Sequence, residues 1–396
     1  MSTIQAPRSI LAVFLVALRL GLTSFGGPIA HIGYFRREYV ERRGWVDEAT
    51  FADLVALCQF LPGPASSQLG IAIGTRRAGI LGGIAAWLGF TLPSAVALIA
   101  LGMIAVRADL SGAGWVHGLK VAAVAVVAQA ILLMARSLAP DARRRAIAIA
   151  ALVAALLVAT PLAQLGIIAC SAIVGRLALP AAAVPKASRE SARIGRRAGA
   201  VALVLFALLL VGLPLLRIPG GQPAALVDSF YRSGALVFGG GHVVLPLLHA
   251  NVVGPGWVAD DAFTAGYGAA QAVPGPLFTF AAYLGTVSSV PPNGIAGGLL
   301  ALVAIFLPAF LLVFGTLPFW EALRSSAGFR RALLGINAAV VGILAAALYT
   351  PIWTSAIGDP ADVVIAAGGL ALLLTGRVPP IAVVALAAIA GQAGIA

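Results

Sequence analysis

The sequence has very little charge. Only 10% of its 396 residues are Asp, Glu, Lys or Arg, while 61% are hydrophobic and the mean hydropathy is +1.02. Soluble domains carry about 25% charged residues, so this composition excludes an ordinary water-soluble protein. Apolar stretches of membrane-spanning length, about 20 residues, recur at Gly79–Val106, Val116–Leu138, Ala198–Leu216 and Gly294–Leu317. We therefore predict an all-α, polytopic membrane protein.

Other functional signals are also missing. The two cysteines, Cys58 and Cys170, lie inside apolar segments and match no disulfide or metal spacing. We find no zinc spacing, no phosphate-binding loop with lysine and no Ser-His-Asp arrangement, so we expect no enzyme, no metal and no cofactor. The net charge of +12 comes from Lys and Arg in short clusters between apolar runs. Such clusters set topology, and we expect no nucleic acid as a partner.

An internal repeat at offsets of 211 to 216 residues is present instead. Four landmarks recur in the same order. Arg19 with Phe25-Gly26-Gly27 recurs as Arg232 with Phe238-Gly239-Gly240, Gly44-Trp45-Val46 as Gly256-Trp257-Val258, Gln59 with Pro62-Gly63-Pro64 as Gln271 with Pro274-Gly275-Pro276, and Gly82-Gly83 with Pro93 as Gly297-Gly298 with Pro308. This many matches in one order indicate two homologous halves.

Each half is predicted to have six segments: a run broken at Phe-Gly-Gly, a run broken at Pro-Gly-Pro, and four helices. We assign residues 1–180 to the first half and residues 224–396 to the second. Residues 181–223 hold a basic linker and one extra connecting helix. Because one additional crossing reverses the direction of every later segment, the second half is expected to be inverted relative to the first.

The distribution of basic residues agrees with inversion. Basic residues follow both broken runs of the first half, whereas the equivalent loops of the second half, Gly254–Asp261 and Ser288–Asn293, contain none. The positive-inside rule then predicts that the first set of loops is cytoplasmic and the second set external. The basic residues assigned to the cytoplasm are Arg36, Arg37, Arg42, Arg43, Arg76, Arg77, Arg143–Arg145, Lys186–Arg197, Arg324, Arg330 and Arg331, with Arg107 and Arg217 as single exceptions outside.

We expect nine full crossings and four broken or re-entrant segments in a cell (inner or plasma) membrane. The N-terminus would be cytoplasmic and the C-terminus external, and the first helix would be retained because no signal-peptide cleavage site comes after it. The run Ala49–Thr75 is long enough for a re-entrant hairpin or for a kinked span.

The two kinds of break are the candidate binding elements. Irregular backbone inside a membrane is tolerated only where protein or a watery cavity satisfies it, and each new half-helix presents free N–H groups that attract anions. The alternative is a pair of packing kinks. The residues that form the breaks are Gly26, Gly27, Pro28, Pro62, Gly63, Pro64, Gly239, Gly240, Pro274, Gly275 and Pro276, and the polar residues of the next turns are Ser66, Ser67, Gln68 and Thr279.

Several polar residues near the breaks are further candidates. Arg19 and Arg232 could converge on one cavity and bind a dianion, or each could extend to an interface. His31 and His242 could couple protons to transport or be structural. Gln59 and Gln271 could line the site or bond freed carbonyls. For Lys120, extension to the interface beside His117 is favoured.

The motifs resemble the chromate ion transporter family. The segment Phe25–His31, the downstream Arg36–Val40, Gly44-Trp45 and the Gln59–Pro64 motif carry the resemblance, which extends over nearly the whole chain. It implies importance for the glycines and prolines of both breaks. The second half departs from the pattern at Gly241, where the first has Pro28.

The resemblance implies export of chromate from the cytoplasm, with sulfate as a similar anion that competes or exchanges. From the inverted repeat and the anion-binding helix ends we expect a secondary transporter that works by alternating access, driven by the membrane potential or by exchange with an ion such as sulfate. A carrier of sulfate or another oxyanion, an anion channel, or a membrane scaffold without a substrate are the alternatives. The expected partners are a small oxyanion, the lipid bilayer and a second copy of the chain in a homodimer.

Overall fold

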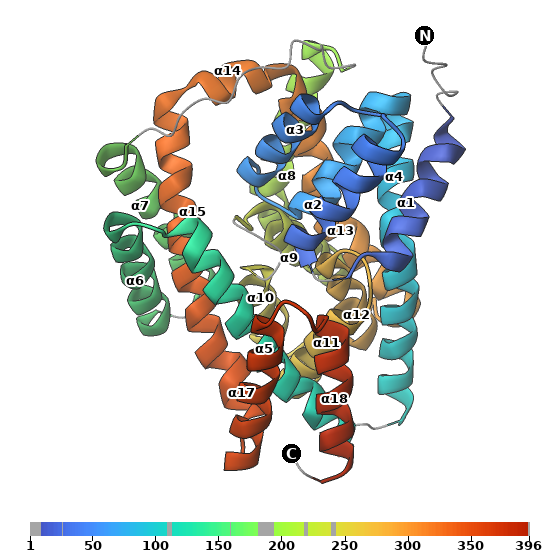
Figure 1. The fold of residues 1–396 in the computed structure, drawn as a ribbon, viewed down its shortest axis with the longest axis vertical. Coiled ribbons are helices and arrows are strands. Elements are labelled where there is room, and N and C mark those ends of the chain that lie inside the picture. The colour runs from blue at the N-terminus through green and yellow to red at the C-terminus, as the bar shows by residue number, and fades with distance from the viewer. Residues whose placement is uncertain are drawn as a thin grey trace.

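The computed structural model describes residues 9–25, 27–108, 113–158, 160–180, 194–217, 221–238 and 243–394, and all regular structure in these ranges is helical (Figure 1). The all-α membrane architecture is therefore confirmed. The α-helices are α1 (Ile10–Thr23), α2 (Gly27–Phe35), α3 (Glu48–Phe60), α4 (Ala65–Ala108), α5 (Gly114–Leu138), α6 (Ala142–Leu157), α7 (Pro161–Ala178), α8 (Arg196–Leu216), α9 (Gly221–Ala235), α10 (Val244–Leu248), α11 (Asp260–Ala272), α12 (Phe280–Val287), α13 (Gly294–Thr316), α14 (Trp320–Ser325), α15 (Ala327–Ala347), α16 (Thr354–Ala356), α17 (Pro360–Leu374) and α18 (Pro380–Gln392). Short π- and 3₁₀-segments are η1 (Arg36–Arg42), η4 (His249–Val253), η5 (Leu277–Thr279), η6 (Leu317–Phe319) and η7 (Leu348–Trp353).

Helix α4 consists of two arms that fold back on each other. Ala78 and Gly79 have non-helical backbone angles, with φ of +70° at Gly79. A Cβ atom on Gly74 would clash with the carbonyl oxygen of Gly82, so the arms, residues 65–77 and 80–108, touch closely. In the second half Gly285 of α12 meets Gly297 of α13 in the same way. Only glycine permits backbones to approach this closely.

The second arm of α4 packs antiparallel to its repeat equivalent, α13. Gly83 lies against Phe314 near one end, and Gly298 lies against Ile99 near the other. Between them the Trp87 and Phe310 rings are 5.4 Å apart. We call side A the side where this arm begins and α13 ends, and side B the side where α13 begins. Equivalent helices of the two halves therefore run in opposite directions.

The runs around the Pro-Gly-Pro breaks are re-entrant hairpins. The guanidinium carbon of Arg77, at the end of the first arm of α4, lies 5.3 Å from the centre of the Trp45 ring, just before α3. In the second half the Ser289 N–H, just after α12, donates to the carbonyl of Trp257, just before α11 (2.8 Å). Each run thus returns to the side from which it entered: side A in the first half, side B in the second.

The runs around the Phe-Gly-Gly breaks also return. Helix α1 enters from side A along the second arm of α4, and Tyr39 of η1 stacks on Trp45 at that side (ring centres 5.4 Å apart). In the second half the Trp257 N–H donates to the carbonyl of Val252 in η4 (2.9 Å), so this run returns to side B.

The helix lengths do not match the prediction of nine full crossings. Helices α6, α7, α17 and α18 have 16, 18, 15 and 13 residues, and at 1.5 Å per residue they reach about 20 to 27 Å, short of a hydrocarbon core of about 30 Å. Among the described residues, five helices are long and apolar enough to cross a membrane: those containing the second arm of α4, α5, α8, α13 and α15. The short helices instead form two further hairpins.

These two hairpins are exchanged between the halves. The α17–α18 hairpin packs on α5 of the first half, where Gly118 meets the backbone of Ala387 and Gln129 Nε2 donates to the Leu373 carbonyl (3.0 Å). The α6–α7 hairpin packs on α15 of the second half, where Gly335 meets the backbone of Ser171. Each half therefore completes the packing of the other.

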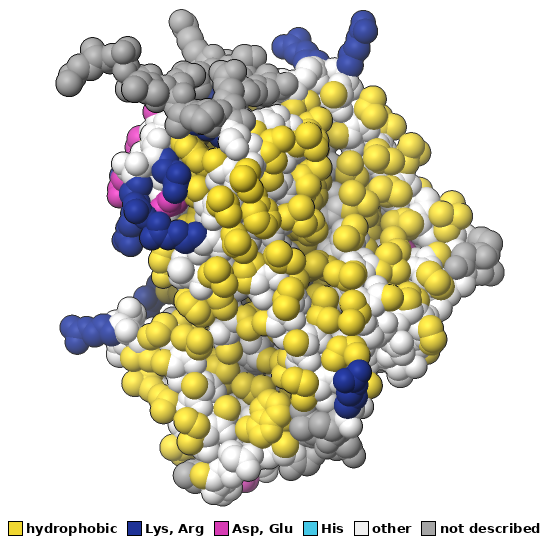
Figure 2. Space-filling model, turned by 90° about the vertical axis from the view of Figure 1, so that its right-hand side faces the viewer, with side chains coloured by type: hydrophobic (Ala, Val, Ile, Leu, Met, Phe, Trp, Pro, Cys, Tyr) yellow, Lys and Arg dark blue, Asp and Glu magenta, His cyan; other side chains and the backbone are white. Residues whose placement is uncertain are grey.

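The outer surface is that of a protein immersed in lipid. Figure 2 shows a face covered mainly by hydrophobic side chains, with charged side chains near its margins. Helix α1 begins at one end of the molecule, and α18 ends at the opposite end (Figure 1). Exposed large apolar residues on α1 and the second arm of α4 include Leu11, Leu15, Leu22, Ile80, Leu81, Leu88, Leu92, Val96 and Ile104.

The glycine contact inside α4 can be tested by Gly74→Ala. We expect a loss of about 1–3 kcal/mol of stability because the added methyl overpacks the two arms. Gly166→Ala is the control, since nothing lies within 4 Å of that glycine and alanine favours a helix. Thermal melting of the purified protein in detergent measures both, and equal melting temperatures for the two variants would contradict the close contact.

Candidate functional site

Each Pro-Gly-Pro break is hydrogen-bonded to the Phe-Gly-Gly break of the other half. The Gly63 N–H donates to the carbonyl of Val237 (2.6 Å), and the Gly275 N–H donates to the carbonyl of Ser24 (3.0 Å). Val237 and Ser24 are repeat equivalents that directly precede Phe238 and Phe25. Gly63 and Gly275 have φ of +119° and +102°, which side chains other than glycine rarely adopt. The breaks of the two halves therefore meet.

The break in the first half leads directly into a helix. Pro64 directly precedes Ala65, and its carbonyl accepts the Gln68 N–H (2.9 Å), while Gln68 Nε2 donates to the Pro62 carbonyl (2.7 Å). The first N–H groups of a helix have no intrahelical partner and carry the positive end of its dipole. The start of the first arm of α4, around Ser66 and Ser67, is thus suited to an anion.

His31 and Ser66 are buried together at this helix start, and further polar atoms of the breaks and of the second arm of α4 are buried without a partner. His31 Nδ1 lies 3.2 Å from Ser66 Oγ, and both residues are buried. Among the described residues no hydrogen-bond partner exists for Ser24 Oγ, His31 Nε2, Ser67 Oγ, Gln68 Oε1, Trp87 Nε1, Thr91 Oγ1 and Gln271 Nε2. Buried polar atoms are normally paired, and leaving one unpaired costs about 1–3 kcal/mol. A bound ligand or bound water would supply the missing hydrogen-bond partners. We call Ser24, His31, Ser66, Ser67, Gln68, Trp87, Thr91 and Gln271 the central cluster.

Aromatic and backbone contacts join the cluster to the breaks. The His31 ring packs edge-on against Phe90 (5.3 Å), the residue before Thr91. A Cβ atom on Gly275 would lie 3.2 Å from the Phe90 carbonyl oxygen and 2.9 Å from Ser94 Oγ. Because the same glycine bonds to Ser24, the second arm of α4 and both breaks surround one region.

The two halves contribute unequally to this region. In the repeat, Phe278, Phe280 and Phe306 occupy the positions of Ser66, Gln68 and Thr91. Thr279 occupies the position of Ser67, but its hydroxyl donates to the Pro276 carbonyl (2.7 Å) and is not free to donate to a ligand. Among the described residues, the first half thus supplies most of the polar atoms, and the second half closes the region with phenylalanines.

The predicted convergence of Arg19 and Arg232 is wrong. Arg19 is exposed on α1, and its positive charge interacts electrostatically with the Glu38 carboxylate of η1. Arg232 donates from Nε and Nη2 to the buried Asp228 carboxylate at 3.0–3.2 Å. Arg19 lies five residues before Ser24, and Arg232 lies five residues before Val237; the carbonyls of Ser24 and Val237 bond to the other half. Five residues correspond to about 7 Å along a helix. Because the halves enter from opposite sides, the two arginines lie on opposite sides of the breaks.

The other predicted residues lie at several places in the structure. Gln59 is exposed and does not line the buried region, whereas Gln271 is partly buried. Gly27 begins α2 with φ of +76°, and the Pro28 side chain is not among those described. Gly26, Gly239, Gly240 and His242 lie outside the described residues.

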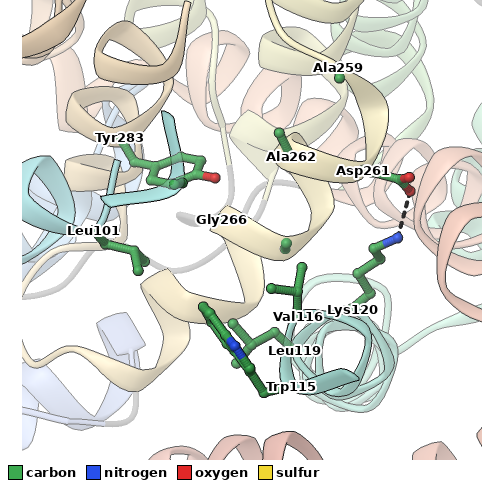
Figure 3. Close-up of a pocket in the computed structure, with 12 residues that line it drawn as sticks. Leu101, Trp115, Val116, Leu119, Lys120, Ala259, Asp261, Ala262, Gly266 and Tyr283 are labelled. Atoms are coloured by element: carbon green, nitrogen blue, oxygen red, sulfur yellow. Dashed lines mark hydrogen bonds and ion pairs between the residues drawn. The ribbon is translucent and has the colours of Figure 1, made fainter. Parts of the chain in front are cut away.

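Lys120 has a partner in the other half, contrary to the expectation that it extends to the interface. Its Nζ donates to Asp261 Oδ1 (2.6 Å), across from α5 to the start of α11 (Figure 3). The pair borders a cavity of about 270 Å³ on side B, which Trp115 and Tyr283 also line. This cavity contains none of the predicted site residues.

Sequence reasoning missed Ser24, Trp87 and Thr91. Ser24 directly precedes the Phe-Gly-Gly motif, so its position was a usable signal. Trp87 and Thr91 lie in an apolar run with no break, and only the three-dimensional packing brings them near the breaks. Asp228 was also missed, although an acid one helical turn before Arg232 is the expected spacing for an ion pair.

Comparisons with known proteins identify two matched regions in the chain. The sequence model of the family described as "Chromate transporter" matches residues 11–176 and 224–392, so both halves are matched separately. No solved structure matches the chain.

Several curated transporters are similar to this chain over most of its length. A chromate transport protein of Pseudomonas aeruginosa is 29% identical over 365 residues, covering 87% of this chain and 81% of that protein. A chromate transport protein of Cupriavidus metallidurans is 28% identical, covering 84% and 80%. An uncharacterized transporter of Methanocaldococcus jannaschii is 27% identical, covering 85% and 83%.

The crosswise link between the halves can be tested by Gly275→Ala. A side chain at φ of +102° costs about 1–3 kcal/mol, and here the methyl also meets Ser94 and Phe90. Gly376→Ala is the matched control, because Gly376 has φ of +68° but nothing within 4 Å. We expect a larger drop in melting temperature for Gly275→Ala, and an equal drop would contradict the contact.

Proposed function

Since the chain belongs to the chromate transporter family, we propose that it binds chromate at the central cluster and exports it from the cytoplasm by alternating access. The observation that carries this proposal is the group of buried, unpartnered polar atoms at the crosswise-bonded breaks. The family is one of membrane transporters, and no enzymatic role is proposed.

The chemistry of the central cluster suits a tetrahedral dianion. Hydroxyls, an imidazole, an indole N–H and an amide can each donate to one of its four oxygens. Hydrogen bonds to an ionised acceptor are about twice as strong as neutral ones, and the positive start of the first arm of α4 adds to them. Since these groups are neutral, the bound anion is held without a permanent counter-charge that would oppose its release.

The relation between the halves supports alternating access. Two antiparallel halves that meet at broken helices can expose one site to either side by rocking against each other. On side B the Lys120–Asp261 pair joins the halves. Gly118 and Gly335 make equivalent contacts, so the repeat places Asn337 where Lys120 stands. Because asparagine is neutral, this position cannot form the same ion pair on side A. We propose that the pair holds side B closed and separates when that side opens.

Direction and orientation are part of the same proposal. Side A carries most of the basic loops, so the positive-inside rule assigns it and the N-terminus to the cytoplasm and the C-terminus to the outside of the plasma membrane. Two negative charges moving outward gain about 4.6 kcal/mol per 100 mV. The membrane potential therefore suffices as a driving force, and exchange against sulfate or another ion is the second route.

Two other functions use the same cluster. Sulfate is also a tetrahedral dianion, so a carrier of sulfate or another oxyanion would need the same donors. An anion channel would conduct through the same breaks without saturable exchange. A homodimer stays a prediction.

Flux measurements test the proposal. Proteoliposomes with radiolabelled chromate or sulfate, under an imposed potential, pH gradient or sulfate gradient, should show saturable chromate flux. Ser67→Ala should lower flux at limiting chromate about tenfold, the effect of one lost hydrogen bond to a charged ligand. Ser137→Ala, on an exposed hydroxyl that bonds only its own helix, is the control.

No chromate flux under any gradient would refute chromate transport. Flux that does not saturate would favour a channel, and a higher affinity for sulfate than for chromate would favour the sulfate carrier. Equal flux through Ser67→Ala and Ser137→Ala would move the site away from the central cluster.

Orientation can be tested with two exposed serines on opposite sides. Ser289 lies at side B and Ser325 at side A. In a background with Cys58→Ala and Cys170→Ala, a membrane-impermeant thiol reagent should label S289C in intact cells. The S325C variant should be labelled only after permeabilisation, and the reverse pattern would invert the assignment.

A further inference from the structure

A second charged cluster lies outside the central cluster, on α8 and α9. The Asp228 carboxylate is 1% exposed and faces two guanidinium groups. Arg232 bonds both of its oxygens, and Arg217 Nε lies 2.9 Å from Oδ2. Arg217 Nη2 also donates to Ser229 Oγ (2.7 Å). Two fixed positive charges against one negative charge leave the cluster with a net charge of +1.

The cluster borders a cavity of about 350 Å³, lined by Thr160, Leu165, Arg217, Arg232, Leu236, Leu247 and Asn251. Although Arg217 Nε is close to Asp228, its N–H is not directed at the carboxylate, and it is buried without a hydrogen-bond acceptor among the described residues. Thr160 caps the start of α7, so the positive end of that helix also borders the cavity. Three sources of positive potential therefore meet at one cavity.

Asn251 lines this cavity, and the first half has a carboxylate at the repeat-equivalent position. The repeat aligns η1 with η4, as the pairs Arg36–Glu48 and His249–Asp260 confirm, with closest distances of 2.8 and 2.7 Å. In this alignment Glu38 corresponds to Asn251. Glu38 is buried and accepts from Arg42 and Arg43 at 2.9 and 2.7 Å, with Arg19 nearby. Arg232 is the repeat equivalent of Arg19. In the second half the neutral Asn251 therefore stands where the first half has the Glu38 carboxylate.

We propose that the cavity between Arg217, Arg232 and Asn251 is a second binding site for a tetrahedral oxyanion group. The bound oxyanion takes the place that the Glu38 carboxylate has in the first half. Its donors are the second N–H of Asn251 Nδ2, which also donates to Ser233 Oγ (3.2 Å), and the guanidinium N–H groups not used by Asp228 or Ser229. The same chemistry accommodates a free oxyanion or the phosphate of an anionic lipid headgroup.

The position of the site suggests its role. Arg232 stands five residues before Val237, whose carbonyl bonds Gly63 at the breaks, and α9 approaches the breaks from side B. A free oxyanion here would be about 7 Å along α9 from the breaks. It would occupy an intermediate binding site on the path between the central cluster and side B. This role rests on the proposed transport of oxyanions, whereas binding itself does not. It also gives a reason for Arg217, a lone basic residue at the end predicted to be external.

Equilibrium binding of radiolabelled sulfate to the purified protein in detergent tests the site. If both sites bind, each chain takes up two sulfates, and Asn251→Asp removes one because its carboxylate neutralises the net charge. Asn251→Ser is the comparison of equal charge: it loses the amide donor but adds no negative charge, so it should weaken the second sulfate without removing it. Arg217→Gln should weaken the same component about tenfold or more, as expected for a lost charge-assisted hydrogen bond. Melting temperatures without sulfate verify that each variant is folded.

Binding at the central cluster and binding at the second cavity can be refuted independently of each other. Ser67→Ala should weaken binding of the sulfate at the central cluster about tenfold and leave unchanged the one that depends on Asn251. Uptake that is the same in Asn251→Asp and Asn251→Ser would rule out a free oxyanion at this cavity.

A second measurement identifies a lipid occupant. Native mass spectrometry of protein in phosphatidylglycerol nanodiscs should then show one fewer bound lipid for Asn251→Asp than for Asn251→Ser. If neither sulfate nor lipid binding distinguishes these two variants, the cavity is not an oxyanion site.

Discussion

The architecture depends on one requirement, which is that a backbone interrupted inside lipid must still have its polar groups paired. Glycine and proline break the helices at Pro62–Pro64 and Pro274–Pro276, and the freed groups need partners that water cannot supply. The Gly63 and Gly275 N–H groups find those partners in the opposite half. Because each half satisfies the other, the breaks are held together, and the antiparallel arrangement of the halves results from that pairing.

The same requirement determines which polar side chains are free to bind a ligand. Once the glycine N–H groups at the breaks are paired between the halves, the hydroxyls around them in the first half are free of that task, while Gln68 still donates to the Pro62 carbonyl. Ser67 and Thr91 keep unpartnered hydroxyls there, while Thr279 uses its own hydroxyl on the Pro276 carbonyl. A symmetric backbone thus supports an asymmetric set of side chains, and binding is concentrated in one half.

Much of this could be predicted from the sequence, because glycine and proline act locally. The repeat, both Pro-Gly-Pro breaks and the helical membrane architecture are encoded in residue types and spacing. The lengths of α6, α7, α17 and α18 could not be predicted, since an apolar run looks the same whether it crosses the membrane or turns back against a neighbouring helix. The expected meeting of Arg19 and Arg232 was wrong for a geometric reason: inverted halves bring together only residues near their common axis, and both arginines stand more than a turn away from it.

The exchange of the terminal hairpins has a consequence for biosynthesis. Helix α5 leaves the ribosome more than 200 residues before α17 and α18, the helices that cover it. Until translation ends, glycine-lined faces such as that around Gly118 must be shielded by lipid, by the insertion machinery or by a neighbouring chain. Quality control of this protein would therefore act on a late event, the docking of residues 360–394.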